Sequence, residues 1–111
     1  MIGIGGNTMM TIQKKSGFTE NALGEKVPAW AEVKTITGWL DLMGGSSGYT
    51  PYSAKIQEST HVFLCDYTPL DVKAENARAV IGTKTYDIML IDNPMELGEH
   101  LEIFLKYTGG Q

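Results

Sequence analysis

The sequence predicts an all-β protein, a small antiparallel β-barrel of about six strands with a long inserted loop. Apolar residues recur mostly with a period of two rather than 3.6, which is typical of strands. The apolar runs are short and separated by turns rich in Gly and Pro. The chain has 111 residues, 42% of them hydrophobic and 20% charged, so it suits one globular domain. We favour a closed barrel over a sandwich because closure removes exposed strand edges.

The last expected strand, residues 100–107, shows the alternation most clearly. One face carries Leu101, Ile103, Leu105 and Tyr107. The other face carries His100, Glu102, Phe104 and Lys106. This pattern predicts a strand that is buried on one face only.

Two further strands are expected just before it, at residues 77–81 and 85–91. The turn between them contains Gly82, and a short turn with glycine between two β-prone runs indicates a hairpin. Pro94 ends the second run, because proline cannot donate a hydrogen bond to a strand ladder.

The first half of the chain predicts strands at residues 9–15, at 32–42, and from near Ala54 or Lys55 to Cys65. Gly38 interrupts the second of these, which predicts a bulge or barrel corner there. Residues 22–31 contain Gly24 and Pro28, which oppose a helix. Residues 70–76 are expected to form one short helical turn. The resulting division is a flexible leader at 1–8, a single barrel domain at 9–108 and a tail at 109–111.

A long Gly/Ser-rich segment separates the second and third expected strands. Loops of this length in a compact domain are usually functional or disordered. Tyr49 and Tyr52 set it apart from a plain linker, because tyrosine is favoured at interfaces. We therefore expect an intermolecular role for this loop. Its candidate residues are Gly44, Gly45, Ser46, Ser47, Gly48, Tyr49, Thr50, Pro51 and Tyr52.

The formal net charge is −4, and the excess of acidic residues lies entirely in residues 66–111. Proteins that grip nucleic acid gain most of their affinity by neutralising phosphates, and no basic patch is readable in this sequence. Binding to DNA, RNA or an anionic membrane is therefore not expected. No apolar stretch approaches the roughly 18 residues of a membrane helix, and the start of the chain lacks the positive charge of a secretory signal.

No catalytic motif or metal-ligand spacing is present, so we expect a non-enzyme with no cofactor and no metal. His61 and His100 stand far apart without Cys or Glu partners at ligand spacing. Cys65 is the single cysteine, so an internal disulfide is excluded, and it is expected to fill space in a strand. The large aromatic residues expected in the core are Trp30, Trp39, Tyr86 and Tyr107.

Two stretches, residues 76–88 and 100–106, are together similar to the C-terminal half of phage head-tail joining proteins. The shared pattern is an arginine, β-prone residues, Gly-x-x-x-Tyr-x-Ile, a short bridge, and His-Leu-Glu-Ile-x-Leu-Lys. The subgroup that the chain most resembles is the head-closure, or stopper, proteins of long-tailed phages and their prophage relatives. The resemblance covers residues 9–108 and includes the order of elements and the mid-chain loop.

The resemblance implies a β-barrel virion protein that self-associates into a ring between a portal-bound adaptor protein and a tail-completion protein. Double-stranded DNA would pass through the ring without specific binding, and the segment Gly44 to Tyr52, extending toward Ile56, would help close this exit channel. The location implied is the head-tail junction of the virion, with the host cytoplasm during assembly and no membrane. Two alternatives stay open: a tail-completion or tail-terminator protein, and an OB-like module for single-stranded nucleic acid, which the net charge disfavours.

Overall fold

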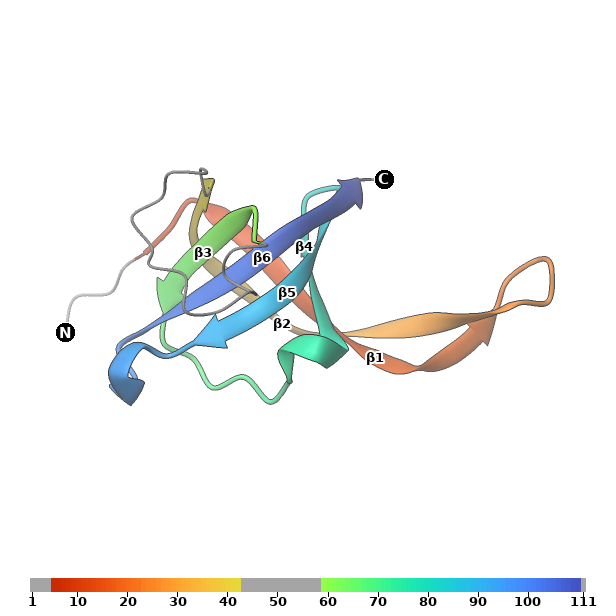
Figure 1. The fold of residues 1–111 in the computed structure, drawn as a ribbon, viewed down its shortest axis with the longest axis horizontal. Coiled ribbons are helices and arrows are strands. Elements are labelled where there is room, and N and C mark those ends of the chain that lie inside the picture. Colours follow the sequence, from red (N-terminus) through yellow and green to blue (C-terminus); the bar gives the residue numbers. More distant parts are fainter. Residues whose placement is uncertain (1–4, 43–58, 111) are drawn as a thin grey trace.

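In the computed structural model, residues 5–42 and 59–110 are described, and their six antiparallel strands close into a barrel (Figure 1). The strands are β1 (Thr8–Glu20), β2 (Lys26–Leu42), β3 (His61–Asp66), β4 (Ala77–Ile81), β5 (Lys84–Asp92) and β6 (His100–Gly110). Two short 3-10 turns, η1 (Ala74–Asn76) and η2 (Pro94–Glu96), precede β4 and β6. The order around the barrel is β1-β2-β3-β6-β5-β4.

Closure is made by a short pairing between β1 and β4, which runs from Thr11 opposite Val80 to Lys14 opposite Ala77. The predicted class, an all-β antiparallel barrel of about six strands, is therefore confirmed. The single turn expected within residues 70–76 is η1. The expected start of the third strand, near Ala54 or Lys55, lies outside the described residues, and the described strand begins at His61.

The main core fills the barrel with side chains from alternate positions of its strands. The core includes Cys65 and Tyr86, as expected, and the side chain of Tyr86 is only 2% exposed. On β6 the inward positions are the predicted ones, since Leu101, Ile103 and Leu105 are buried. The largest fully buried side chains are Phe63, Phe104, Met10, Ile12, Ile103, Leu105 and Cys65.

Phe104 shows that β6 is more deeply buried than its alternation predicted. It lies opposite Val62 in the β3–β6 register, and the two form a second small apolar cluster. Leu64, Met89 and Leu90 pack against this cluster. Part of the face that was expected to be polar is therefore covered as well.

The expectation that all four large aromatic residues lie in the core is wrong for two of them. Trp39 is 41% exposed and Tyr107 is 42% exposed. Trp39 follows Gly38, which is buried, and strand alternation therefore turns the indole to the outer face. Trp30 is partly buried, but it lies where β2 leaves the barrel.

Gly38 is not a bulge, because its pairing is regular with Thr8 on one side and with Cys65 on the other. Of the two predicted features, a bulge or a barrel corner, the bulge is therefore wrong and the corner stays a prediction. A Cβ atom at Gly38 would lie 2.3 Å from the carbonyl oxygen of Leu64 and 2.8 Å from the ring of Phe63. The glycine is required by this close approach of backbone and ring.

β1 and β2 are both longer than the expected strands at 9–15 and 32–42, because they continue outward as a two-stranded ribbon. We call residues 15–30 the arm, and Figure 1 shows it extending to the right of the barrel. The turn at its tip is held by the side chain of Asn21, whose Oδ1 accepts hydrogen bonds from the backbone N–H groups of Leu23 and Glu25. The sequence pattern missed the arm because few of its side chains are buried, so burial imposes no alternation.

The described ends of the chain pair with the barrel. The backbone N–H of Asn7 donates to the carbonyl oxygen of Gly38 at 3.0 Å, and β6 continues through Gly110. The division into a leader at 1–8, a domain at 9–108 and a tail at 109–111 stays a prediction.

Candidate functional site: a loop frame and a basic depression

The predicted site, Gly44 to Tyr52, lies outside the described residues. The structure does describe the residues at which this connection leaves and rejoins the barrel. We call these residues, Leu42, Ser59, Thr60 and His61, the frame. Leu42 on β2 is directly opposite His61 on β3 in an antiparallel register. Residues 43–60 therefore connect two neighbouring strands at one end of the barrel, where a hairpin needs only about 2–5 residues.

Thr60 fastens the returning end of this segment to β6. Its backbone N–H donates to the carbonyl oxygen of Leu105 at 2.8 Å. Its hydroxyl accepts a hydrogen bond from the backbone N–H of Tyr107 at 2.8 Å and lies 2.8 Å from Nδ1 of His61. Ser59, just before it, is buried. These contacts make the frame a rigid part of the barrel.

Three aromatic rings, one each on β3, β5 and β6, contact one another next to the frame. The ring of His61 meets the ring of Tyr86 edge-on, with centroids 5.2 Å apart. The ring of Tyr86 in turn lies beside the ring of Tyr107, with centroids 5.5 Å apart. Burial, and then the nearby positive charge of Lys84, lower the pKa of His61 below its ordinary value of 6.5. His61 is therefore neutral at neutral pH.

This lowered pKa predicts that the barrel is less stable in mild acid. Because the unfolded chain binds the proton of His61 more readily, the free energy of unfolding should decrease as pH falls through 6.5. Thermal melts between about pH 7.5 and pH 5 should show this decrease for the wild type and a shallower one for His61→Gln. An unchanged slope in His61→Gln would contradict the assignment.

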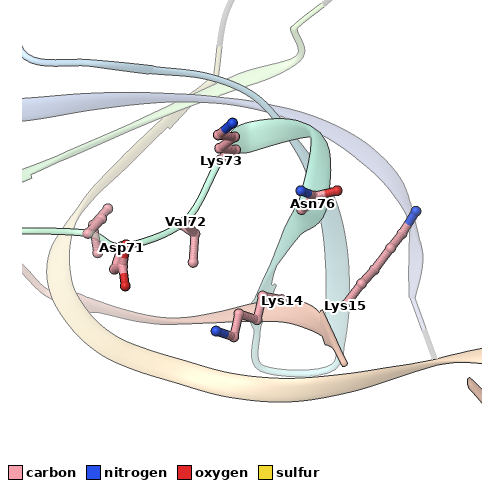
Figure 2. Close-up of a pocket in the computed structure, with 7 residues that line it drawn as sticks. Lys14, Lys15, Asp71, Val72, Lys73 and Asn76 are labelled. Atoms are coloured by element: carbon pink, nitrogen blue, oxygen red, sulfur yellow. The ribbon is translucent and has the colours of Figure 1, made fainter. Parts of the chain in front are cut away.

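A basic depression lies on the described surface where the arm leaves the barrel (Figure 2). It has a volume of about 550 Å³. Lys14 and Lys15 come from β1, four lining residues belong to the segment that leads into η1, and Asn76 is the last residue of η1. We call this site the depression, and its lining residues are Lys14, Lys15, Leu70, Asp71, Val72, Lys73 and Asn76.

The segment that forms one wall of the depression is tied to β2 by Lys34. The ammonium group of Lys34 donates to the hydroxyl of Thr68 at 2.7 Å and to the carbonyl oxygen of Pro69 at 3.3 Å. Sequence reasoning missed this site because its lysines come from two distant parts of the chain. Only barrel closure, which sets β1 beside β4, brings them together.

Arg78 on β4 fixes the root of the arm beside the depression. Its Nε donates to Oε1 of Gln13 on β1 at 2.7 Å. Its guanidinium group lies 4.2 Å from the ring centroid of Trp30 on β2. One side chain therefore connects three strands, through a charged hydrogen bond and a cation–π contact.

The remaining candidates for chemistry are not brought together. His61 and His100 lie at opposite ends of the β3–β6 pair, opposite Leu105 and Asp66 respectively. Burial, and then the charge of Asp66, raise the pKa of the Cys65 thiol to about 11, so the thiol is protonated and unreactive at neutral pH. Within residues 5–42 and 59–110, no three His, Cys, Asp or Glu side chains are grouped closely enough to hold a metal ion.

In the described part of the chain, no helix has the length and apolar character that crossing a membrane requires.

The sequence of residues 6–107 matches the family model described as phage head completion protein. The chain belongs to the phage head completion protein family. It is therefore a structural component of a phage-like virion, and the family is non-enzymatic. This membership confirms both the resemblance found in the sequence and the prediction of a non-enzyme.

Comparison of folds agrees with the family assignment. This head completion protein is similar to a solved chain described as "Virion of native gene transfer agent (GTA) particle", with a TM-score of 0.53 and 13% sequence identity. The match covers 94% of this chain and 96% of that chain, so the likeness in fold is not confined to one part of the chain. A comparison with curated proteins found no match.

Proposed function

We propose that this head completion protein forms a ring at the head-tail junction, between a portal-bound adaptor protein and a tail-completion protein. In this proposal the segment Gly44 to Tyr52 projects toward the axis of the ring and helps to close the DNA exit channel. The protein would be made in the host cytoplasm and built into the virion during assembly. A protein of similar fold belongs to the virion of a gene transfer agent particle, which is consistent with such a place.

The observation that carries the proposal is the pairing of Leu42 with His61 at the base of a long connection. Two neighbouring antiparallel strands need no more than a short turn between them, so most of residues 43–60 is not required for the barrel to close. Thr60 supports this view, because its hydrogen bonds fix the end of the connection to β6. A segment held this way can act on other chains while the barrel keeps its fold.

Charge supports the passage of DNA without specific binding. The net charge is −4, with its acidic excess in residues 66–111. DNA is a polyanion, and like charges do not hold it in place. The depression, although basic, has no aromatic side chain in its lining on which a base could stack, which disfavours the OB-like alternative.

The test replaces residues 43–58 with a short Gly/Ser turn and keeps Ser59 and Thr60. We expect the purified variant to retain its β-sheet circular dichroism and its melting temperature within a few degrees. Particles assembled with the variant should package DNA and then lose it, which nuclease sensitivity of the packaged DNA measures.

A second variant, a tyrosine-free Gly/Ser segment of the original length, separates the role of Tyr49 and Tyr52 from that of loop length. The proposal fails if either the barrel unfolds on shortening or the particles keep their DNA and remain infectious. Pull-down of the full chain separates the remaining alternative, since a tail-completion or tail-terminator protein would capture the tail tube and not the portal-bound adaptor.

A further inference from the structure

The arm is an exposed two-stranded ribbon, and within residues 5–42 and 59–110 no further strand pairs with its edges. β1 pairs with β4 only at residues 11–14, and β2 pairs with β3 only at residues 38–42. An isolated two-stranded ribbon is marginally stable in water, and unpaired strand edges invite another chain. Two large apolar side chains are exposed on it, Phe18 at 71% and Leu23 at 84%. This surface is suited to a partner.

The charges of the arm and the depression are complementary. Lys15, at the root of the arm, lines the depression, and the other charged residues of the arm, Glu20, Glu25 and Lys26, sum to −1. The depression carries three lysines and Asp71, which sum to +2. Leu70 and Val72 add apolar side chains to the lining of the depression. The two surfaces therefore match in charge and in apolar character, and both belong to the same chain.

The arm is long enough to reach a neighbouring copy. From Lys15 to Asn21 the ribbon extends roughly 20 Å, at about 3.3 Å per residue. The two shorter dimensions of the molecule are 31 Å and 24 Å. An arm of this length can cross the boundary between two barrels set side by side. The depression lies at the root of the same arm, and the two strands stay paired outward to Glu20 opposite Lys26, with one register shift between Lys15 and Phe18. A paired ribbon therefore carries its tip away from its own depression.

We propose that the arm of one copy docks in the depression of the next copy, so that the tip with Leu23 contacts the wall formed by Leu70 and Val72. This contact is heterologous, since it joins two different surfaces, and repeated contacts of this kind generate a ring when the rotation closes. Arg78 holds the arm at its root through Gln13 and Trp30 and thereby limits the directions in which it can point. The inference deepens the proposed ring function and rests on it.

Charge reversal in the full chain tests the contact. An arm-reversed variant, E20K/E25K/K26E, keeps opposite charges at the paired positions 20 and 26. A depression-reversed variant, K14E/K15E/D71K/K73E, inverts the other surface. Each alone should lower self-association about tenfold at low salt, measured by sedimentation, because attractive contacts become repulsive. A chain that carries both the arm-reversed and the depression-reversed substitutions should associate like the wild type, since the two surfaces are again complementary.

Cross-linking locates the contact independently of charge. In L23C/V72C, oxidation should give a ladder of disulfide-linked multimers, while buried Cys65 does not react. The matched pair L23C/L97C, which places the second thiol on the loop after η2, should give no ladder. A control charge variant in η2 and the loop after it, E96K/E99K, should associate like the wild type. Circular dichroism checks that each variant is folded.

The proposal is overturned if both reversed variants associate like the wild type, or if the folded double-set chain fails to recover. It is also overturned if the depression-reversed variant changes only the binding of a DNA duplex. Failure of the proposed channel function would be a separate result. In that case particles with the shortened loop would retain their DNA, while L23C/V72C would still give its ladder of multimers. If L23C/V72C gives no ladder while particles with the shortened loop still lose their DNA, only the proposed arm contact is refuted.

Discussion

Replacing Gly38 with alanine is expected to destabilise the barrel by about 3 kcal/mol or more, which is a large part of the roughly 5–15 kcal/mol that holds a small domain folded. The added Cβ would lie 2.3 Å from the carbonyl oxygen of Leu64, a backbone atom of the neighbouring strand. It would also meet the ring of Phe63 at 2.8 Å. Because Gly38 pairs with both Thr8 and Cys65, any shift that relieves the clash disturbs the ladder on both sides. Denaturant unfolding of the purified chain measures the loss.

Thr37→Ala is the matched control for this prediction, because Thr37 is the neighbouring residue of β2 and its side chain is exposed. A surface change of this kind normally alters the free energy of unfolding by no more than about 0.5 kcal/mol. Equal stability of Gly38→Ala and Thr37→Ala would show that the close approach at Gly38 is not a constraint on the fold.

Replacing Phe63 with alanine should cost about 3–5 kcal/mol of the free energy of unfolding. Phe63 is fully buried on β3, and its ring packs against the backbone at Gly38. Removing the ring leaves a cavity at the centre of the barrel, which the paired strands cannot collapse to fill. Urea unfolding monitored by circular dichroism should show the midpoint shifted to much lower denaturant.

Phe18→Ala makes the same chemical change on the exposed arm and should leave the unfolding midpoint nearly unchanged. If the two phenylalanine variants proved equally stable, Phe63 would not be a central core residue. The double variant Gly38→Ala/Phe63→Ala adds a further check. Because its alanine at position 38 enters space vacated by the ring, its cost should be smaller than the sum of the two single costs.

Local pattern was sufficient for much of the barrel. On β6 the positions of Leu101, Ile103 and Leu105 follow directly from alternation, because a strand that covers a core must bury every second side chain. Gly82 and Pro94 marked where β4 turned and where β5 ended, since their backbone preferences act within a few residues. The family resemblance followed from the order of these same elements.

Local pattern failed where a residue's surroundings come from distant parts of the chain. Gly38 predicted a bulge or a barrel corner, because the ring of Phe63 that requires a glycine there lies on another strand. Trp39 was placed in the core because a large aromatic side chain is usually buried, but its strand position turns it outward. For Gly38, the neighbours that decide the outcome are more than twenty residues away in the chain.

Alternation, turn residues and length, all readable along the chain, predicted about six strands, the all-β class and the likeness to phage joining proteins. The root contacts of Arg78 and the depression exist only after barrel closure sets β1 against β4. The physical reason is the distance along the chain over which each effect acts. Backbone preference and strand periodicity act between neighbours in sequence. A charged depression and an unpaired ribbon depend instead on which strands the closed sheet joins and which it leaves open.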